Sequence, residues 1–365
     1  MFRILVAVLF VVTSACASNV NNNPFQVRAL AEFNEPWAMA FLPDGRLLIT
    51  EMNGRLLLVS TDDGSAIPVS GVPTVDYGGQ GGLGDIALHP DFADNSRIYL
   101  SYVEAGDDNT RGAVAVSATL SLETGNETLS DVNVIWRQSP KVKGRGHYGH
   151  RLLFSQDGYL FISSGERQKF DPAQEMSGNL GKILRLNDDG SVPEDNPFAE
   201  RGGITAQIWS LGHRNPLGLA FDAEGQLWNV EMGPRGGDEL NRVLPGTNYG
   251  YPIVSNGRHY SGINIPDHDT RPEFEAPKTW WTPVISPGGF MIYSGDMFSD
   301  WKGDGLIAGL SSEALVRVEF DGENASEAER YPMGKRIRAV TQGPDGAIWL
   351  LEDEAGGRLL KLTPR

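Results

Sequence analysis

Hydrophobic residues along this chain fall into short runs separated by turns, and the same arrangement recurs. Each copy has an apolar pair, a turn that contains Asp or Gly, and a second run rich in Leu, Ile, Tyr or Trp. Residues 37–50 read WAMAFLPDGRLLIT, and residues 150–164 read HRLLFSQDGYLFISS. Runs of this length between turn residues predict pairs of antiparallel strands.

Six such units follow one another, spaced roughly 45 to 75 residues apart, a period typical of β-propeller blades. The other four lie at residues 84–102, 217–230, 288–310 and 337–351, of which 288–310 is the loosest copy. A further strand follows each unit, such as GRLLLV after the first and GRLLKL after the last. One blade cannot bury both of its faces alone, so blades pack radially. We therefore predict an all-β, six-bladed β-propeller over residues 28–365. A pair of β-sandwiches is disfavoured because no linker divides the chain.

The first residues have the pattern of an export signal. Met1-Phe2-Arg3 precedes the apolar run ILVAVLFVV, and small residues follow up to Ala17. A positive start, a short apolar stretch and an A-x-A site predict a signal peptide over residues 1–17. The run is too short to span a bilayer. Cleavage after Ala17 or lipid attachment at Cys16, in a loose lipobox, both predict a periplasmic or exported protein. Residues 18–27 would form a tether.

Charge and cysteine content limit the kinds of molecule that this protein can be expected to bind. The formal net charge is −16 and the isoelectric point is about 4.8, which argues against nucleic acid or an anionic membrane surface as a partner. A membrane would be reached only through a lipid anchor. Cys16 is the single cysteine, so the mature domain has no disulfide despite its predicted export. A small anionic ligand is still compatible with this composition if cations gather locally.

Several polar residues stand in glycine-rich stretches just before these units. Gln80 lies in YGGQGGLGD, His147 and His150 lie in GHYGHRLLF, and Arg214 and Asn215 lie in LGHRNPLGLAF. Each has an ordinary explanation as a turn or structural residue. Glycines, however, let a backbone approach a ligand closely, and a loop histidine suits a general base. Zinc binding by the two histidines is disfavoured because the glycines oppose a helix and no third ligand is near.

Two further stretches offer sites for ions. The sequence EMGPRGGDELNRVLPGTNYGYP has carboxylates at Glu231, Asp238 and Glu239 among glycines, and such loops supply the oxygen ligands that calcium prefers. In GKRIRAV, Arg336 and Arg338 alternate, so a strand would send both to one face. Solvated arginines are the usual explanation. An inward-facing pair would instead form an anion site in this acidic protein.

Five motifs in this order resemble the soluble quinoprotein glucose dehydrogenases and aldose sugar dehydrogenases. They are GQGGLGDIALHPDF, GHYGHRLLF, LGHRNPLGLAF, MGPRGGDELN and RIRAVTQGPDG, and the resemblance extends from Pro36 to Leu362. The resemblance implies a six-bladed propeller that holds pyrroloquinoline quinone (PQQ) and calcium at one face. It also implies oxidation of aldoses at the C1 hydroxyl to lactones, with a soluble electron acceptor such as a quinone or a cytochrome.

The resemblance assigns roles to the catalytic and cofactor-binding positions. His147 matches the general base that takes the proton of the anomeric hydroxyl while hydride passes from C1 to the quinone. Arg214 matches the arginine that stabilises negative charge growing on the quinone oxygen. The matches to cofactor contacts are Gln80, Asn215, Arg336 and Arg338.

The resemblance also implies metal and substrate positions. The carbonyls of Gly233 and Pro234 match the ligands of the cofactor-bound calcium, which would act as a Lewis acid. Glu239 and the backbone at Tyr249 resemble a second, structural calcium site. Trp281 resembles an aromatic residue that packs against the sugar.

Two departures from the family pattern favour the broader aldose dehydrogenase branch. In IAGLSSEAL, Ser311 stands where the family often has a lysine beside the cofactor, so one positive charge is lost. Gly146 stands where glucose dehydrogenases have an aspartate, so a partner that orients His147 is missing or comes from elsewhere. Two rival functions remain, a calcium-dependent propeller lactonase and a non-catalytic propeller that binds sugar or protein.

Overall fold

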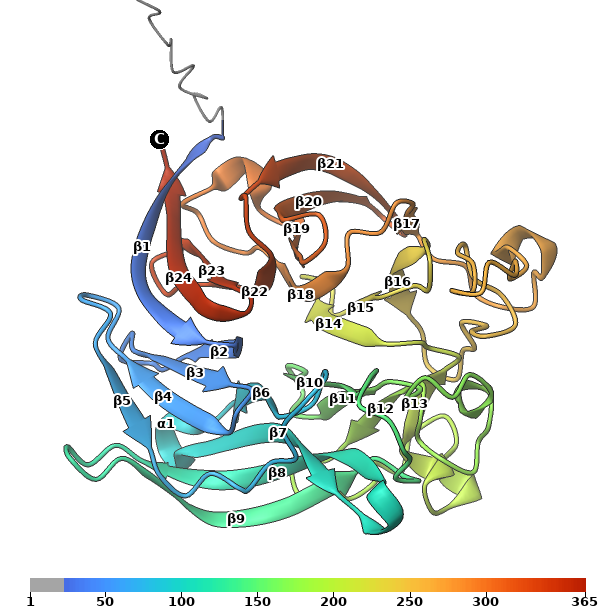
Figure 1. Cartoon of the computed structure of the whole chain (residues 1–365), viewed down its shortest axis with the longest axis horizontal. Helices are drawn as coiled ribbons and strands as arrows, with labels where there is room; N and C mark the ends of the chain where they lie inside the picture. Colours follow the sequence, from blue (N-terminus) through green and yellow to red (C-terminus); the bar gives the residue numbers. More distant parts are fainter. Residues whose placement is uncertain (1–22) are drawn as a thin grey trace, which may run out of the picture.

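The structure, a computed structural model, describes residues 23–365 and forms a six-bladed β-propeller (Figure 1). Six antiparallel sheets of four strands each surround a common axis, which confirms the predicted fold. The predicted signal peptide, Cys16 and the tether up to residue 22 lie outside the described residues. No helix within residues 23–365 is long and apolar enough to cross a membrane.

Each predicted unit forms the first two strands of a blade. The innermost strands are β2 (Pro36–Phe41), β6 (Leu83–Leu88), β10 (Gly149–Phe154), β14 (Pro216–Phe221), β18 (Pro287–Ile292) and β22 (Ile337–Gln342). The second strands are β3 (Leu47–Glu51), β7 (Arg97–Ala105), β11 (Leu160–Ser164), β15 (Leu227–Glu231), β19 (Gly305–Gly309) and β23 (Ile348–Glu352).

Two more strands complete each blade toward the rim. The third strands are β4 (Arg55–Val59), β8 (Arg111–Ser121), β12 (Lys182–Leu186), β16 (Asp238–Val243), β20 (Ala314–Asp321) and β24 (Ala355–Pro364). The outer strands are β5 (Ala66–Val69), β9 (Thr128–Arg137), β13 (Ile208–Leu211), β17 (Thr279–Trp281), β21 (Asn324–Pro332) and β1 (Phe25–Asn34). Helical structure in the described residues is limited to α1 (Phe92–Asn95) and the 3-10 turns Asp107–Asn109, Asp171–Ala173, Ala199–Arg201, Thr205–Gln207, His268–Thr270 and Ser299–Trp301.

The ring closes by joining the two ends of the described chain in one blade. Strand β1, blue in Figure 1, pairs antiparallel with β24, red, from Phe25 opposite Pro364 onward. Phe25 is buried and makes edge-to-face contacts with Trp301 and Tyr331. Residues 25–27 therefore belong to the propeller and not to the tether in which the sequence prediction placed them. The shared blade leaves no unpaired strand at the closure, which protects sheet edges.

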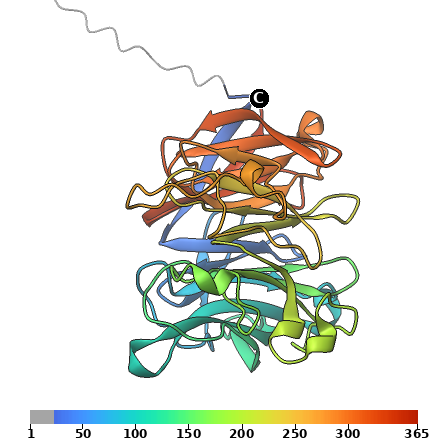
Figure 2. The same cartoon turned by 90° about the vertical axis from the view of Figure 1, so that its right-hand side faces the viewer.

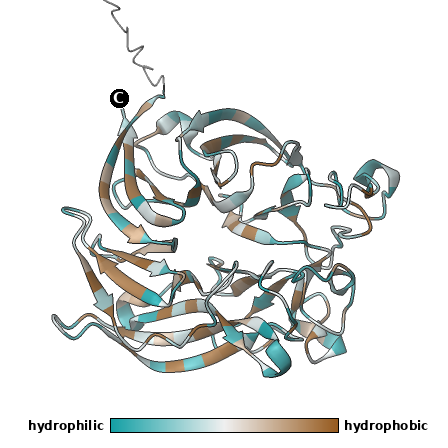
Figure 3. Ribbon diagram, in the orientation of Figure 1, coloured by the Kyte–Doolittle hydropathy of each residue, from teal (hydrophilic) through white to brown (hydrophobic). Residues whose placement is uncertain are grey.

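Hydrophobic residues line both faces of the second strands because each blade is covered on both sides. Leu47, Leu48 and Ile49 of β3 are all fully buried, although consecutive strand residues point to opposite faces. Figure 3 shows the same pattern, with hydrophobic colour along the strands and hydrophilic colour at many turns. Each inter-blade interface is thus a sheet-on-sheet core, and this packing holds the ring together.

A buried guanidinium links five blades near the axis. Arg151 in β10 donates from Nε to the carbonyl of Leu217 at 2.7 Å, from Nη1 to Asp85 at 3.0 Å, and from Nη2 to the carbonyl of Gly288. Its Cζ lies 3.9 Å from the ring centroid of Trp37. These partners belong to β14, β6, β18 and β2. Burial lowers the pKa of Arg151 and raises the pKa of Asp85, while each charge opposes the shift of the other.

The longest excursion from the blades is the connection between β16 and β17, residues 244–278. It stands out from the ring in Figure 1 and lies across the side that faces the viewer in Figure 2. Its one regular element is the 3-10 turn His268–Thr270.

Candidate functional site

The candidate residues meet where inner strands begin and second strands end. In an antiparallel pair these two ends are neighbours, as the registers of Gly149 with Ser164, Pro216 with Glu231 and Ile337 with Glu352 show. Residues just outside these pairs therefore project toward one face of the ring. Because every blade has the same strand order, loops that lie far apart in the sequence meet at this face.

Two adjoining cavities on this face hold the predicted side chains, and a third, of about 490 Å³, shares His147, Arg214 and Pro234 with the larger of the two. The larger has a volume of about 1190 Å³, and its lining includes Gln80, His147, Arg214, Met232, Gly233 and Pro234. The smaller has a volume of about 270 Å³, and its lining includes Gln80, Asn215, Met232, Arg336 and Arg338. Because Gln80 and Met232 line both, the structure places all the predicted cofactor-contact and catalytic side chains along one continuous surface.

His147 is held rigidly at the edge of the larger cavity. Its φ of 52° is in the left-handed region, and its N–H donates to Oε1 of Gln80 at 2.7 Å. Its Nδ1 lies 2.5 Å from Oε1 of Glu166, a residue just beyond β11. Only 6% of His147 is exposed. Gln80 thus fixes the backbone of His147, and Glu166 fixes its ring.

Glu166 is the orienting partner that the sequence analysis did not find. It is fully buried, and its second oxygen accepts the N–H groups of Lys169 at 2.5 Å and Phe170 at 2.8 Å. A Cβ on Gly146 would lie 2.7 Å from Cδ of Gln168, so Gln168 fills the space beside the glycine. The carboxylate therefore comes from the end of β11. The sequence offered one signal for this role, namely the position of Glu166 in SSGE, directly after a buried strand.

Electrostatics favour a neutral imidazole paired with an ionised carboxylate. Burial lowers the pKa of His147, and the charge of Arg214 adds to this effect, while Glu166 opposes it. Burial would raise the pKa of Glu166, but His147 and the backbone N–H of Phe170 hold it below the usual value. An ionised Glu166 accepts the proton of Nδ1, so Nε2 is the nitrogen that can take up a proton.

A buried guanidinium clamps the loop that carries His147. Arg167 is only 1% exposed and donates to the carbonyls of Gly146 at 2.8 Å, Arg111 at 2.7 Å and Gly144 at 2.7 Å. Its Cζ stacks 3.8 Å above the ring of Tyr148. Burial lowers its pKa to about 10, so it stays charged at neutral pH. No motif in the sequence indicated a role for Arg167.

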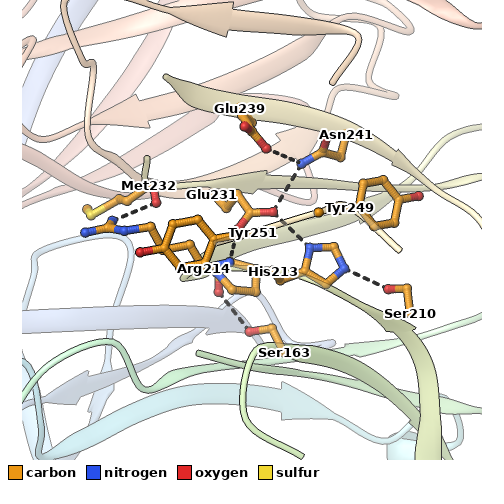
Figure 4. A network of polar contacts seen from close by, with 12 residues as sticks. Ser163, Ser210, His213, Arg214, Glu231, Met232, Glu239, Asn241, Tyr249 and Tyr251 are labelled. Carbon is orange, nitrogen blue, oxygen red and sulfur yellow. Dashed lines mark hydrogen bonds and ion pairs between the residues drawn. The ribbon is translucent and has the colours of Figure 1, made fainter. Parts of the chain in front are cut away.

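Arg214 presents unused hydrogen-bond donors to the cavity. Its backbone N–H donates to Glu231 at 2.6 Å, and its Nη1 donates to the carbonyls of Met232 at 2.8 Å and Gly233 at 2.6 Å (Figure 4). Its Nε and the amide Nδ2 of Asn215 are buried without a hydrogen-bond partner among residues 23–365. Buried donors of this kind are costly unless a ligand satisfies them.

Arg336 and Arg338 share one face, as their alternation predicts. The Nε of each donates to Asp353 at 2.9 Å. Burial would raise the pKa of Asp353, but the two guanidinium groups hold it below its usual value. Arg336 also lies 3.3 Å from the exposed carboxylate of Glu354, and both arginines line the smaller cavity, where their guanidinium groups can meet an anionic ligand. Ser311, which replaces the family lysine, is exposed and donates to the carbonyl of Val284 at 3.2 Å.

The predicted calcium ligands at Gly233 and Pro234 line the larger cavity. Asp238 holds this turn through the N–H of Gly233 at 2.9 Å and also accepts the N–H of Ser286 at 2.6 Å. The carbonyl of Gly233 accepts a hydrogen bond from Arg214. A cation at this carbonyl would either share the oxygen with the guanidinium, since a carbonyl has two lone pairs, or displace the guanidinium from it.

Glu239 lies in an acidic network beside this turn (Figure 4). Nδ2 of Asn241 lies 3.2 Å from Glu231 and 3.4 Å from Glu239, while Oδ1 of Asn241 has no partner in the described chain. His213 lies 2.9 Å from Glu231. Burial, together with the charge of Glu231, raises the pKa of Glu239 well above its usual value. A bound cation would offset the repulsion between the buried carboxylates of Glu231 and Glu239.

The other predicted ligand of this site is a backbone group. The carbonyl of Tyr249 lies 3.1 Å from Nε2 of His268, and its ring stacks on His213 at 4.7 Å. Within residues 23–365 no three histidine, cysteine or acidic side chains gather as a metal site. A calcium ion here would rely on Glu239 together with carbonyl and amide oxygens, which are oxygen donors that it accepts.

We expect calcium to raise the melting temperature of the wild-type protein, and Glu239→Gln to remove this dependence. An ion that binds only the folded state adds about 2.7 kcal/mol at 100 times its Kd. Thermal unfolding with excess calcium or with EDTA measures the effect. The exposed Glu224→Gln is the matched control and should keep the full calcium response. An unchanged response in Glu239→Gln would place the ion elsewhere.

Trp281 lies outside both cavities, whereas His150 lines the smaller cavity as a packing residue. His150 is buried, with Nδ1 2.9 Å from the hydroxyl of Ser101 and its ring 4.8 Å from that of Trp37. Burial lowers its pKa to about 3, so it is a neutral packing residue. Trp281 is also buried, donates to Glu327 and lines neither cavity, so the structure does not bring it to the predicted sugar site. Tyr260 lines the larger cavity instead.

Several known proteins are similar to this chain in sequence and in fold. The family model described as Glucose / Sorbosone dehydrogenase matches residues 33–361. Aldose sugar dehydrogenase YliI of Escherichia coli is 41% identical over 340 residues, which cover 92% of this chain and 91% of that protein. A crystal structure of the soluble aldose sugar dehydrogenase of Escherichia coli in the apo-form has a TM-score of 0.88 and 40% identity, covering 93% of this chain and 100% of that one. The PQQ-bound form of an aldose sugar dehydrogenase from Streptomyces coelicolor has a TM-score of 0.76 and 28% identity, covering 93% and 98%.

Proposed function

This chain belongs to the Glucose / Sorbosone dehydrogenase family, and from that premise we propose that it oxidises aldoses at the C1 hydroxyl to lactones with PQQ and calcium. We further propose that residues 1–17 export it to the periplasm. The observation that carries the proposed function is the continuous cavity surface that His147, Arg214, Arg336 and Arg338 line, with Glu166 buried behind the ring of His147.

The residues present suit a polyanionic quinone. Arg214 Nε and Asn215 Nδ2 are buried donors that need acceptors, and the guanidinium groups of Arg336 and Arg338 line the smaller cavity. Carboxylates and carbonyl oxygens on a cofactor would satisfy these groups. The PQQ-bound relative from Streptomyces coelicolor supports the choice of cofactor. The loss of the lysine at Ser311 removes one cation but leaves these donors intact.

His147 is placed to take the proton from the sugar. Its neutral imidazole, held by Glu166 through Nδ1, can accept the C1 hydroxyl proton at Nε2. Glu166 then stabilises the positive imidazolium, because an ionised carboxylate 2.5 Å away favours the charged ring. Bound PQQ would supply the acceptor for the hydride that leaves C1. The proton and the hydride together account for the two hydrogens that an aldose loses.

Arg214 and the Gly233 turn would stabilise negative charge. The guanidinium lies between the carbonyl of Gly233 and the rings of Tyr251 and Tyr260, whose centroids are 5.8 Å and 5.9 Å from its Cζ. The carbonyls of Gly233 and Pro234 would hold calcium, whose other ligands would have to come from the cofactor and water. If calcium takes the Gly233 carbonyl, Nη1 of Arg214 becomes a donor for the ligand, in addition to Nε.

Reconstitution tests the proposed function. The purified protein is loaded with calcium and PQQ, and dye reduction is followed with a panel of aldoses. We expect a cofactor absorption spectrum and lactone formation, and a quinone and a cytochrome then serve as trial acceptors. No spectrum and no turnover would refute the proposal. Lactone hydrolysis with metal but without PQQ would instead identify a lactonase, although such a site needs side-chain carboxylates around the metal.

We expect Arg167→Met to lower the rate of aldose oxidation by roughly 10- to 100-fold, because a small displacement of a catalytic group is expensive. The substitution leaves three buried carbonyls that face the lost guanidinium. Steady-state kinetics should show the loss mainly in kcat, with PQQ still bound. Arg145→Met is the control, since Arg145 is half-exposed on the neighbouring surface and pairs with Asp76. Wild-type kcat in Arg167→Met would show that the clamp does not position His147.

A further inference from the structure

A separate cavity of about 500 Å³ lies beside the projecting 244–278 connection. Its lining consists of Asn256, Asp267, His268, Asp269, Pro272, Phe274, Ala276 and Trp280. None of the residues assigned above to catalysis, cofactor or metal binding belongs to this set. The cavity therefore needs an explanation of its own.

The central feature of this cavity is a tryptophan that the fold leaves uncovered. Trp280 is 53% exposed, whereas its neighbour Trp281 is buried, because alternate residues of β17 point to opposite faces. Strand β17 is the outer strand of its blade and pairs only with β16. All eight tryptophans of the chain lie in the described part, and Trp280 is the one that is exposed. Its indole can stack against a ligand.

The lining of this cavity also contains polar groups. Asp267 and Asp269 are exposed carboxylates, and Asn256 adds an amide that both donates and accepts. An aromatic face beside hydroxyl acceptors suits a pyranose, whose C–H face is apolar and whose edge carries hydroxyl groups. A site built from few polar groups and an apolar platform orients such a neutral ligand.

A cationic ligand would also be attracted by carboxylates and an indole. The guanidinium of Arg271 lies over the ring of Phe274, with Cζ 5.3 Å from the ring centroid, but its charge is already paired with Glu273 at 2.6 Å and does not decide between the two ligands. The wall that this cavity shares with the proposed aldose-oxidising cavity favours a saccharide over an ammonium compound.

The cavity shares a wall with the proposed catalytic cavity. Asn256 and Asp267 line both the 500 Å³ cavity and the 1190 Å³ cavity. We propose that the Trp280 cavity is a subsite for a neutral, non-reacting sugar unit of an oligosaccharide whose reducing end enters the larger cavity. This inference rests on the proposed aldose oxidation for its reacting end, but the binding that it predicts needs no turnover.

Binding of maltotriose and cellotriose to the full chain tests the subsite. Because Trp280 is the exposed tryptophan, a trisaccharide should protect the wild-type fluorescence from acrylamide quenching, and Asp267→Ala/Asp269→Ala should reduce the protection. Calorimetry with Trp280→Ala should show at least a tenfold weaker trisaccharide affinity, whereas Trp280→Phe should stay within about threefold of wild type. His147→Ala should bind like the wild type, and Ile67→Ala, an exposed residue on β5, is the surface control.

Each other outcome overturns the inference. Binding that is lost in His147→Ala but kept in Trp280→Ala would confine the sugar to the catalytic cavity. Tetramethylammonium binding without trisaccharide binding would make this a cation site, and binding of neither would leave no ligand site. These binding experiments need neither PQQ nor calcium, so failure of the dehydrogenase reaction would not change their results. In active enzyme, Trp280→Ala should raise KM for a trisaccharide at least tenfold and leave KM for glucose within about twofold.

Discussion

Replacing His147 by alanine should lower kcat for aldose oxidation by about 10²- to 10⁴-fold, the usual contribution of a general base. The protein should still bind PQQ, because the unpartnered donors belong to Arg214 and Asn215 and the guanidinium groups of the smaller cavity to Arg336 and Arg338. Single-turnover kinetics and the cofactor spectrum measure the two effects separately. His89→Ala is the matched control, since His89 is a partly buried histidine that pairs with Asp188 away from the site. An active His147→Ala enzyme would mean that another group takes the proton.

Glu166→Gln isolates the orienting carboxylate of the same pair. Burial lowers the pKa of His147, so the base stays unprotonated at neutral pH, and activity should fall only as acid protonates it. Glu166 raises the pKa of His147, so its removal should shift the acid limb of kcat/KM to lower pH. The plateau should also fall, because Nδ1 loses its acceptor. A lower plateau with an unmoved acid limb would contradict the electrostatic part of this role.

Arg151→Met should cost about 3 to 5 kcal/mol of unfolding free energy, the effect of breaking one partner from a buried ion pair. The substitution leaves Asp85 buried without its cation and leaves the carbonyls of Leu217 and Gly288 without this donor. Because the partners lie on different blades, the loss weakens the ring at its centre. Urea titration measures the change.

Two comparison variants make this result interpretable. Arg46→Met removes a solvent-exposed pair with Asp44 and should change the free energy of unfolding by only about 0 to 1 kcal/mol. The double variant Asp85→Asn/Arg151→Met should lose less than the sum of the two single variants, because the partners interact directly. Additive losses would show that the two side chains stabilise the ring independently.

The residues that line the cavity surface can be recognised in the sequence, but the residues that hold them in place cannot. Gln80, His147 and Arg214 stand in glycine-rich loops just before inner strands, and this local feature is visible in the sequence. Glu166 and Arg167 support His147 from the loop after β11, at the opposite end of a hairpin. Only strand pairing makes that end a neighbour of His147. The family pattern suggested a carboxylate at position 146, but Gln168 fills that space.

Trp281 and Trp280 show a different limit. Both sit in a three-residue strand, and the sequence does not say which face of β17 the neighbouring blade will cover. The structure turns Trp281 into the core against Glu327 and leaves Trp280 exposed beside a cavity. The resemblance pointed to one aromatic residue, and the orientation of the strand exposes the other.

By itself the sequence determined the six-bladed fold, because apolar periodicity and turn residues are local properties repeated along the chain. It also determined the family, through five motifs in order. Only the tertiary structure decided which charges pair, that Glu166 orients His147, that Arg151 joins five blades, and that residues 25–27 close the ring. All of these features depend on contacts between segments that lie far apart in the sequence, in one case at opposite ends of the domain. No local pattern of residues encodes such contacts.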